Sequence, residues 1–234
     1  LVIAFLYFMS AVTVLRVDRP GLASQQGKTG TFNEMREGLL YVGQHPKVFA
    51  LIVLSIVPFL FGMPLNTLLP AFNEDVLGGH ADSLGLLISA MGAGAIIGSI
   101  LMAGMGELRR KGLWLLLSCG VWGVLTALFG LTQSSIAALF VIAFIGLLSS
   151  WNMSLNRGML QMTVDDHMRG RIMSIDMMSH GLMPLGVFPI SWVAEVYGVG
   201  SALMVSGCVF VLLTILSFIC LRSVRGLTKA PASA

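Results

Sequence analysis

The 234-residue chain is 56% hydrophobic and only 11% charged, and its formal net charge is +3. Soluble domains usually contain about 25% charged residues, so this composition excludes a water-soluble globular protein and indicates an integral membrane protein. The positive charge does not indicate nucleic-acid binding, because topology and contact with anionic lipid account for it.

The positions of the basic residues predict the topology. The fourteen Lys and Arg residues occur in four clusters, and each pair of apolar stretches between clusters is joined by a connection without Lys or Arg. Cytoplasmic loops collect Lys and Arg because positive charge resists translocation. The pattern therefore predicts an all-α polytopic membrane protein with every cluster on the cytoplasmic side. The clusters lie within residues 16–47, 109–111, 157–171 and 222–229.

The chain begins inside an apolar run, without a basic n-region or a cleavage site, which is not typical of a signal peptide. We expect a fragment in which residues 1–15 are the end of a truncated span. Residues 16–47 form the longest connection, and its second half shows the helical spacing of a short amphipathic helix at the membrane surface. Residues 222–234 are expected to be a cytoplasmic tail.

Residues 48–221 are expected to form a bundle of six spans, because a spanning helix needs about 20 apolar residues. Pro58, Pro64 and Pro70 predict kinks in the first span, since proline breaks the backbone hydrogen-bond ladder. Gly94 and Gly98 form a small-xxx-small pair that predicts a close helix contact. The expected spans are 48–72, 84–104, 113–131, 136–156, 172–194 and 201–221.

The segment 172–194 is the least apolar of the six, since it carries Asp176, His180, Pro184 and Pro189. Charge sidedness decides the assignment. If this segment did not cross, the C-terminal basic cluster would lie on the side opposite to Arg169 and Arg171.

Two nucleotide-binding motifs fail on spacing. A P-loop ending at residues 27–29 would need a glycine at position 22, where the chain has Leu22. Residues 92–98 resemble a dinucleotide fingerprint with the wrong spacing, inside an apolar helix. No Ser/His/Asp set or metal-ligand spacing stands out, so we expect no enzyme activity, no cofactor and no metal.

Polar residues inside apolar spans are candidate site residues, because they are costly in lipid unless they face a cavity or another helix. Asn152 and Asn156 share one helix face, where cavity lining and interhelical hydrogen bonding are both open. Asn66 and Thr67 lie mid-span in the proline-rich segment and are further candidates for the cavity.

Asp176 and His180 are four residues apart and are candidates for a proton-coupling pair, since histidine titrates near physiological pH. The alternative is an interfacial pair that is solvated by headgroup water or bonded to Arg169 or Arg171. We favour this alternative, because both residues lie within two to three turns of the basic loop.

The basic loops have two interpretations. They could supply only the positive charge of the cytoplasmic side, or they could form a charge clamp that holds one conformation closed. The candidates for such a cytoplasmic gate are Glu107, Arg109, Arg110, Arg157, Arg169 and Arg171.

Three strings carry a family resemblance. The short loop at 104–112 resembles the loop between spans 8 and 9 of major facilitator superfamily transporters, although Glu107 is the nearest acid where the family usually has Asp. Residues 156–161 with 169–171 resemble the loop between spans 10 and 11, and 16–47 resembles the central loop. The chain is thus similar to the C-terminal half of the superfamily, in the branch of the enterobactin exporter and macrolide or multidrug efflux proteins.

This resemblance implies twelve spans in total, with the N-terminal six-helix half missing from the fragment. It implies alternating access in the bacterial inner membrane and export of a small amphipathic substrate, siderophore or drug-like, driven by protons. Spans 7, 8, 10 and 11 would line the cavity, the lipid bilayer would surround them, and the C-terminus would be cytoplasmic. One alternative is a non-transporting scaffold or partner-binding subunit, which would have few intramembrane polar residues and large soluble loops, the opposite of this chain. The other is an intramembrane enzyme, which would need a paired catalytic set at one depth.

Overall fold

The computed structural model describes residues 8–10, 12–13, 31–105 and 110–221, but not the side chains of Thr31 and Phe32. The chain divides into two units, Leu1–Glu34 and Met35–Ala234. In the first unit, residues 8–10 and 12–13 are helical, and the Thr13 hydroxyl donates to the Met9 carbonyl at 2.7 Å. The expected truncated span is thus described only in part, and the C-terminal tail lies outside the described residues.

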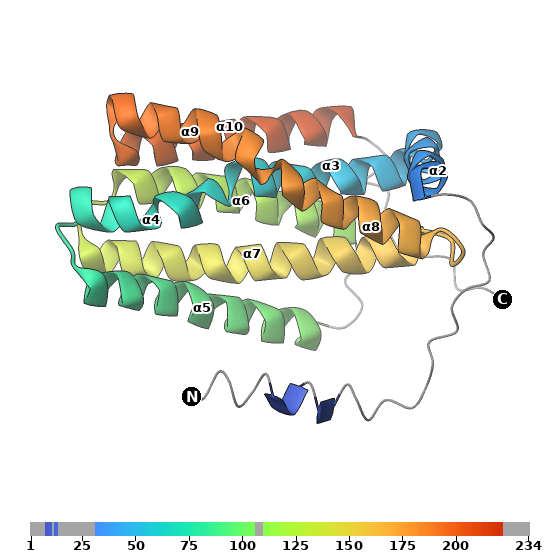
Figure 1. Ribbon diagram of the computed structural model, residues 1–234. Helices are drawn as coiled ribbons and strands as arrows, with labels where there is room; N and C mark the ends of the chain where they lie inside the picture. The colour runs from blue at the N-terminus through green and yellow to red at the C-terminus, as the bar shows by residue number, and fades with distance from the viewer. Residues whose placement is uncertain (1–7, 11, 14–30, 106–109, 222–234) are drawn as a thin grey trace. The chain divides into compact units, whose positions relative to one another are not determined.

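The second unit is a bundle of helices (Figure 1). No strand occurs among the residues that the structure describes, in agreement with the predicted all-α class. Helix α2 begins in the first unit and ends in the second. The elements are α2 Thr31–Gln44, α3 Pro46–Phe61, α4 Pro64–Asp75, α5 Ala81–Gly104, α6 Lys111–Leu131, α7 Ser135–Thr163, α8 Arg169–Ser179, the 3-10 helix η1 His180–Leu182, α9 Met183–Tyr197 and α10 Val199–Cys220.

Five segments in the described part of the chain are long and apolar enough to cross a membrane. They agree with five of the six expected spans, although the fourth extends seven residues past the expected end, to Thr163. The protein is therefore a polytopic membrane bundle. The five segments are Pro46–Asp75, Ala81–Gly104, Lys111–Leu131, Ser135–Thr163 and Val199–Cys220.

The sixth expected span is interrupted, so the prediction of one helix over 172–194 is wrong in its continuity. Helices α8 and α9 follow one another along the bundle and are joined by η1 (Figure 1). Pro184 has no N–H to donate to the carbonyl four residues before it. That carbonyl belongs to His180, and the Met183 N–H bonds it instead, which tightens the chain into a 3-10 turn.

The first span is interrupted as well, between Phe61 and Pro64. The N–H groups of Gly62 and Met63 both donate to the Pro58 carbonyl, and Pro64 then begins α4. The Ser206 hydroxyl of α10 donates to the Phe61 carbonyl at 2.7 Å. Of the three expected proline kinks, the one at Pro64 coincides with a break, while Pro58 and Pro70 lie within helices.

Glycines bring three helix pairs to backbone contact: α5 with α7, α6 with α10, and α9 with α3, where a Cβ at Gly186 would collide with the Leu60 carbonyl. A Cβ at Gly94 or Gly98 would collide with the carbonyl of Ala143 or Leu147 on α7, which confirms the predicted close contact. Gly146 of α7 meets α5 in the same way. Helices α6 and α10 are joined by a similar contact, where Gly207 meets the backbone of α6.

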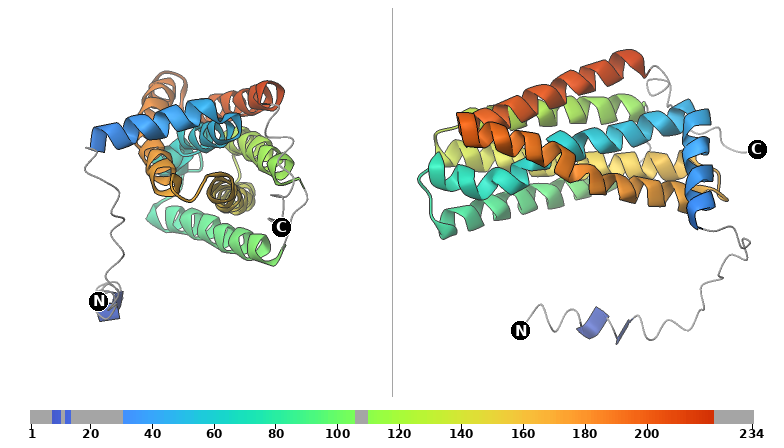
Figure 2. Two further views of the ribbon diagram at one scale, coloured as in Figure 1. Left: turned by 90° about the vertical axis from the view of Figure 1, so that its right-hand side faces the viewer. Right: turned by 45° about the horizontal axis from the view of Figure 1, so that its top comes forward.

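Charge separates the two ends of the bundle. The end at which α8 begins and α7 finishes, which we call the basic end, carries Lys and Arg, and α2 runs across it (Figure 2). The opposite end, which we call the acidic end, carries Glu74, Asp75, Asp82 and Glu195. The described basic residues are Arg36, Lys47, Arg110, Lys111, Arg157, Arg169 and Arg171.

Candidate functional site

A buried carboxylate lies where three helices meet. Asp176 of α8 is only 2% exposed, and its Oδ1 accepts a hydrogen bond of 2.7 Å from the Ser55 hydroxyl of α3. Its Oδ2 lies 3.9 Å from Nε of Arg157 on α7. A charged group away from water needs such partners. Asp176 therefore connects α8 to both α3 and α7.

His180 continues this cluster at the break between α8 and α9. Its Nδ1 lies 2.8 Å from the backbone carbonyl of Asp176, so Nδ1 carries a proton and donates to that oxygen. Its Nε2 lies 3.2 Å from Nη2 of Arg157, which is a pure donor, so Nε2 accepts. The imidazole also packs on Phe59 of α3, with ring centroids 3.8 Å apart. This arrangement fits a neutral imidazole, since a proton on Nε2 would place two donors face to face.

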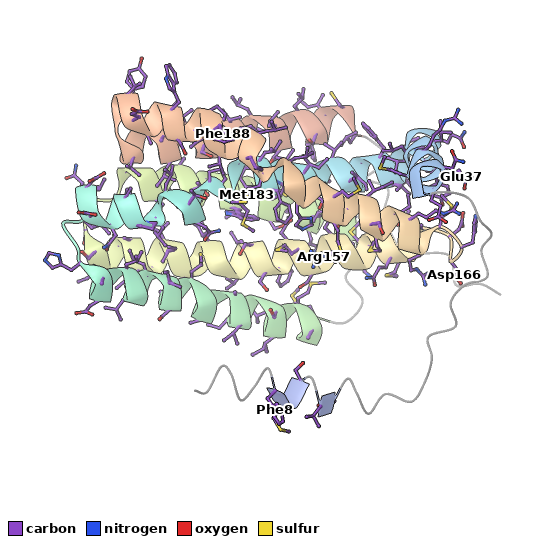
Figure 3. The ribbon with its side chains drawn as sticks, in the orientation of Figure 1. Phe8, Glu37, Arg157, Asp166, Met183 and Phe188 are labelled. Atoms are coloured by element: carbon purple, nitrogen blue, oxygen red, sulfur yellow. The ribbon has the colours of Figure 1, made fainter. Side chains whose placement is uncertain are left out.

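The favoured interpretation of Asp176, in which it is solvated or bonded to Arg169 or Arg171, is wrong. Arg169 instead donates to Asp166 at 2.6 Å, and Arg171 pairs with Glu37 of α2. Distance along the chain from the basic loop did not predict the partner of Asp176, because Asp176 lies on the face of α8 that packs inward. The arginine that it meets is Arg157, which lies part-way along the bundle, whereas Glu37 and Asp166 lie at the basic end (Figure 3).

The two asparagines of α7 have different surroundings. Nδ2 of Asn152 donates to α6, at 3.3 Å from the Leu115 carbonyl and 3.0 Å from the Ser118 hydroxyl. This is the interhelical hydrogen bonding that was one of the two open alternatives. Asn156 is 3% exposed, and its buried Oδ1 has no hydrogen-bond partner among the described residues.

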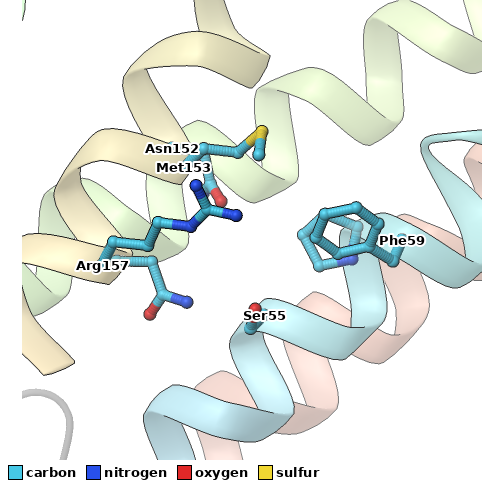
Figure 4. A pocket seen from close by; sticks show the side chains of 7 residues that line it. Ser55, Phe59, Asn152, Met153 and Arg157 are labelled. Atoms are coloured by element: carbon cyan, nitrogen blue, oxygen red, sulfur yellow. The ribbon is translucent and has the colours of Figure 1, made fainter. Parts of the chain in front are cut away.

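A small pocket between α3 and α7 adjoins this cluster (Figure 4). Both asparagines line it. Arg157 reaches from α7 towards Ser55 and Phe59 on α3. The lining residues are Ser55, Pro58, Phe59, Asn152, Met153, Asn156 and Arg157.

Asn66 and Thr67 are not brought into this pocket. Both are exposed on α4, and Nδ2 of Asn66 lies 3.2 Å from the Met63 sulfur within its own turn. The break between α3 and α4 separates them from the part of α3 that faces Asn156.

The expected gate residues are distributed differently. Glu107 and Arg109 lie outside the described residues. Arg110 is exposed and precedes α6 with a left-handed backbone (φ 63°). Arg157 contacts the buried Asp176, although its own side chain is 43% exposed. Arg169 and Arg171 lie at the basic end, in the first turn of α8.

Tyr41 of α2 also joins this end, and the sequence did not single it out. Its hydroxyl donates to Asp165 at 2.9 Å. Burial is the main cause that raises the pKa of Tyr41, so the hydroxyl stays a donor at neutral pH. Ser55 and Phe59 were also missed, since a serine and a phenylalanine in an apolar span carry no signal of their own.

Comparison with known proteins identifies the family of this chain. A family model described as transmembrane secretion effector matches residues 1–232. The staphyloferrin A transporter of Staphylococcus aureus is 27% identical over 186 residues, which cover 79% of this chain and 46% of that protein. Macrolide efflux protein A of Streptococcus pyogenes is 24% identical over 207 residues, covering 87% of this chain and 51% of that protein.

Macrolide efflux protein A of Enterococcus faecalis is also similar, at 24% identity over 75% of this chain and 55% of that protein. The chain therefore spans about half the length of the curated relatives it matches. The family model, in contrast, covers nearly every residue. The chain belongs to the transmembrane secretion effector family of the major facilitator superfamily, which is a family of transporters and not of enzymes.

Proposed function

We propose that this chain is the C-terminal half of a secondary active transporter that exports a small amphipathic molecule, siderophore or drug-like, by alternating access. The family, the relatives named for a siderophore and for macrolides, and the share of their length that is matched all support this proposal. The N-terminal six-helix half would complete the central cavity, since superfamily transporters bind substrate between two such bundles.

The proposed location is the bacterial cytoplasmic membrane, with the basic end and the C-terminus on the cytoplasmic side. The clustering of the described Lys and Arg residues at one end of the bundle supports this orientation, because short cytoplasmic loops collect positive charge. In this orientation α2 lies on the cytoplasmic surface. The acidic end would face the outside.

The observation that carries the proposal is the cluster of Asp176, Arg157 and His180 at the contact between two interrupted helices. Transporters characteristically form their sites from discontinuous helices. Here the break at η1 follows Asp176 directly, and Phe59 lies just before the break in the first span. A charge change in this cluster therefore acts next to the points where both helices can bend.

The hydrogen-bond directions support proton coupling at this cluster. A proton on Nε2 of His180 would remove the acceptor for Arg157, and a proton on Asp176 would remove the opposite charge. Either event weakens the contact between α7 and the α8–α9 segment. We infer that proton exchange at this pair drives the rearrangement of α8 and α9 relative to α7.

The pocket between α3 and α7 is the proposed part of the substrate path in this half, with Asn152 and Asn156 in its wall. Asn66 and Thr67 extend the proposed path towards the acidic end, where their side chains are exposed. Arg110, Arg169 and Arg171, with Glu107 and Arg109, are the proposed cytoplasmic gate. The bond between Arg171 and Glu37 is the kind of contact that would hold it closed.

The test is flux through the full-length transporter in proteoliposomes, with a panel of lipophilic acids, bases and neutral compounds. At least one compound should move faster when a pH gradient is imposed. Asp176→Asn should remove this stimulation, whereas Asp166→Asn, the same change in an exposed carboxylate, should retain it. The proposal is wrong if the wild-type protein shows no gradient-dependent flux of any compound in the panel.

A further inference from the structure

We propose that α2 is a latch: it is bound across the joint between α7 and α8 in this structure, and it must leave that position when α8 moves relative to α7. The inference rests on the proposed function, because it names the element that restrains α8 at the cytoplasmic gate. Neither the description of the family nor the names of the relatives assigns a role to this helix.

One set of contacts fixes α2 to the connection between α7 and α8. Helix α2 runs across the basic end of the bundle, where α7 finishes and α8 begins (Figure 2). Val42 of α2 is buried in the same apolar cluster as Val164 and Met168 of that connection. The Tyr41 hydroxyl donates to Asp165, also in the connection, at 2.9 Å. Both apolar and polar side chains of α2 are thus bound to the segment that joins the two helices.

A second set of contacts fixes α2 to α8 itself. Gly38 is buried against α8, where an added Cβ would lie 2.7 Å from Cδ1 of Ile175 and 3.7 Å from Cβ of Arg171. The Arg171 guanidinium also donates to the Glu37 carboxylate. Because α2 is bound both to the connection and to α8, it holds the start of α8 in place relative to the end of α7.

The junction between α2 and α3 can act as a pivot for the latch. Only His45 separates Gln44, the last residue of α2, from Pro46, the first residue of α3. Proline has no N–H, so the hydrogen-bond ladder of α2 cannot continue unbroken into α3. The His45 imidazole stacks on Tyr41, with ring centroids 3.9 Å apart. Helix α2 can therefore swing away from α8 while it stays attached to α3.

The contacts that hold α2 are of a kind that can be broken and remade. Glu37 is 51% exposed in its ion pair with Arg171, and the hydrogen bond to the connection is exposed as well. Exposed pairs of this kind contribute little to stability. Leu39 and Leu40 are 54% and 51% exposed, so α2 is bound to the bundle through one narrow face.

The position of the latch gives it control over the proposed proton site. Asp176 follows Ile175 directly in α8, and its partner Arg157 lies on α7. The proposed rearrangement moves α8 and α9 relative to α7. It cannot proceed at the basic end while α2 is bound on both sides of the joint, so release of α2 is a step of the transport cycle.

A reversible cross-link tests whether α2 must move. The Cβ atoms of a disulfide are about 3.5–4.5 Å apart, and a Cβ at Gly38 would lie 3.7 Å from that of Arg171. Gly38→Cys and Arg171→Cys are combined in the full-length transporter after its native cysteines have been replaced by alanine. Oxidation should abolish gradient-driven flux in proteoliposomes, and reduction with dithiothreitol should restore it. The reduced form of the same protein is the reference, so loss of the arginine does not affect the comparison.

Ser99→Cys combined with Ser150→Cys is the matched control. The two serine hydroxyls lie 2.7 Å apart between α5 and α7, which glycines bring to backbone contact. This disulfide joins helices that are not expected to separate, so flux should be the same in its oxidised and reduced forms. Unchanged flux in the α2 cross-link would overturn the latch. Equal loss of flux in both cross-linked proteins would overturn its assignment to α2.

A distance measurement decides on the latch without flux. Spin labels are attached at Leu39→Cys on α2 and Ser154→Cys on α7, both exposed, and double electron–electron resonance gives the distance between them. Asp176→Asn, which mimics the protonated carboxylate, should add a second and longer distance. Asp82→Asn at the acidic end should not. The same single distance in the parent protein and in both variants would overturn the latch.

Failure of the latch and failure of the proposed function are distinguishable. A longer distance in Asp176→Asn, without gradient-dependent flux of any compound in the parent protein, would contradict the transport proposal and support the latch. Gradient-dependent flux that persists when α2 is cross-linked to α8 would contradict the latch alone.

Discussion

The bundle contains continuous helices and interrupted ones, and the two regions differ in what they can do. Helices α5 and α7, like α6 and α10, meet through glycines at backbone distance, and the helices of each pair are continuous. The α3–α4 and α8–α9 segments are both interrupted, and near their breaks they contribute Ser55, Phe59, Asp176 and His180 to the polar cluster. The continuous pairs suit a fixed framework. The interrupted segments also meet at a glycine, where Gly186 of α9 lies against the Leu60 carbonyl of α3, but their breaks suit bending.

Helix α7 belongs to both regions. Its first half carries Gly146, which meets Met91 of α5, and its second half carries Asn152, Asn156 and Arg157. A single continuous helix thus presents the polar side chains to two interrupted segments. The substrate and proton candidates therefore lie where framework and interrupted helices meet.

Placing a methyl group in the framework should have the largest effect. A Cβ at Gly146 would collide with the Met91 carbonyl, which is backbone and cannot rotate away. Overpacking typically costs about 1–3 kcal/mol, and a backbone collision belongs at the upper end. Gly146→Ala should therefore clearly lower the thermal unfolding temperature of the solubilised full-length protein.

Gly158→Ala is the matched control, because nothing lies within 4 Å of the added methyl group on the same helix. There alanine should be neutral or stabilising, by up to about 1 kcal/mol, from its better helix propensity. Equal unfolding temperatures for the two variants would contradict the idea of a tightly joined framework.

Removing the charge from the cluster should have a smaller effect on stability than on transport. Asp176→Asn keeps the side-chain size and weakens the contact with Arg157, which is 43% exposed and can rehydrate. We expect a loss of about 1–2 kcal/mol in the free energy of unfolding, near the value of a hydrogen bond to a charged group.

The measurement compares unfolding temperature and gradient-driven flux for Asp176→Asn and for the exposed-site control Asp166→Asn. A purely structural Asp176 would lose flux only in proportion to the loss of folded protein. A folded Asp176→Asn protein with normal coupling would remove this carboxylate from the mechanism.

Charge sidedness and apolar length predicted the helical class and most of the spans, because both depend on composition along the chain. The close contact at Gly94 and Gly98 was also predictable, since two small residues four apart mark a helix face. The break at His180–Leu182 was only partly signalled, by Pro184. Proline weakens a helix, but tertiary contacts decide whether it bends or breaks.

The composition of the site was less predictable. Asp176 and His180 were recognised as candidates, yet their partner Arg157 was assigned to the gate. Packing of the whole bundle decides which face of α8 points inward. Distance along the chain from the basic loop does not predict that face. A lone acid and a lone arginine within two apolar segments were the available signal, since charges inside a bundle tend to pair.

Removing the hydrogen bond from α10 to the break in the first span should lower the stability of the protein only slightly. Ser206→Ala removes the hydroxyl that donates to the Phe61 carbonyl from α10. Interhelical hydrogen bonds in membranes contribute about 0.6 kcal/mol on average, so a small decrease in unfolding temperature is expected. Ser174→Ala, which removes an exposed hydroxyl bonded within its own helix, should have less effect.

Loss of the contact between α2 and the loop before α8 should have the smallest effect on stability. Tyr41→Phe removes the bond to Asp165 at a partly exposed site, where such contacts contribute about 0–1 kcal/mol. Tyr197→Phe at the acidic end, where the side chain is 67% exposed, is the control. Because α8 carries Asp176, loosening its start should alter gradient-driven flux more than the unfolding temperature. Unchanged flux in both variants would limit the moving region to the breaks themselves and leave α2 outside it.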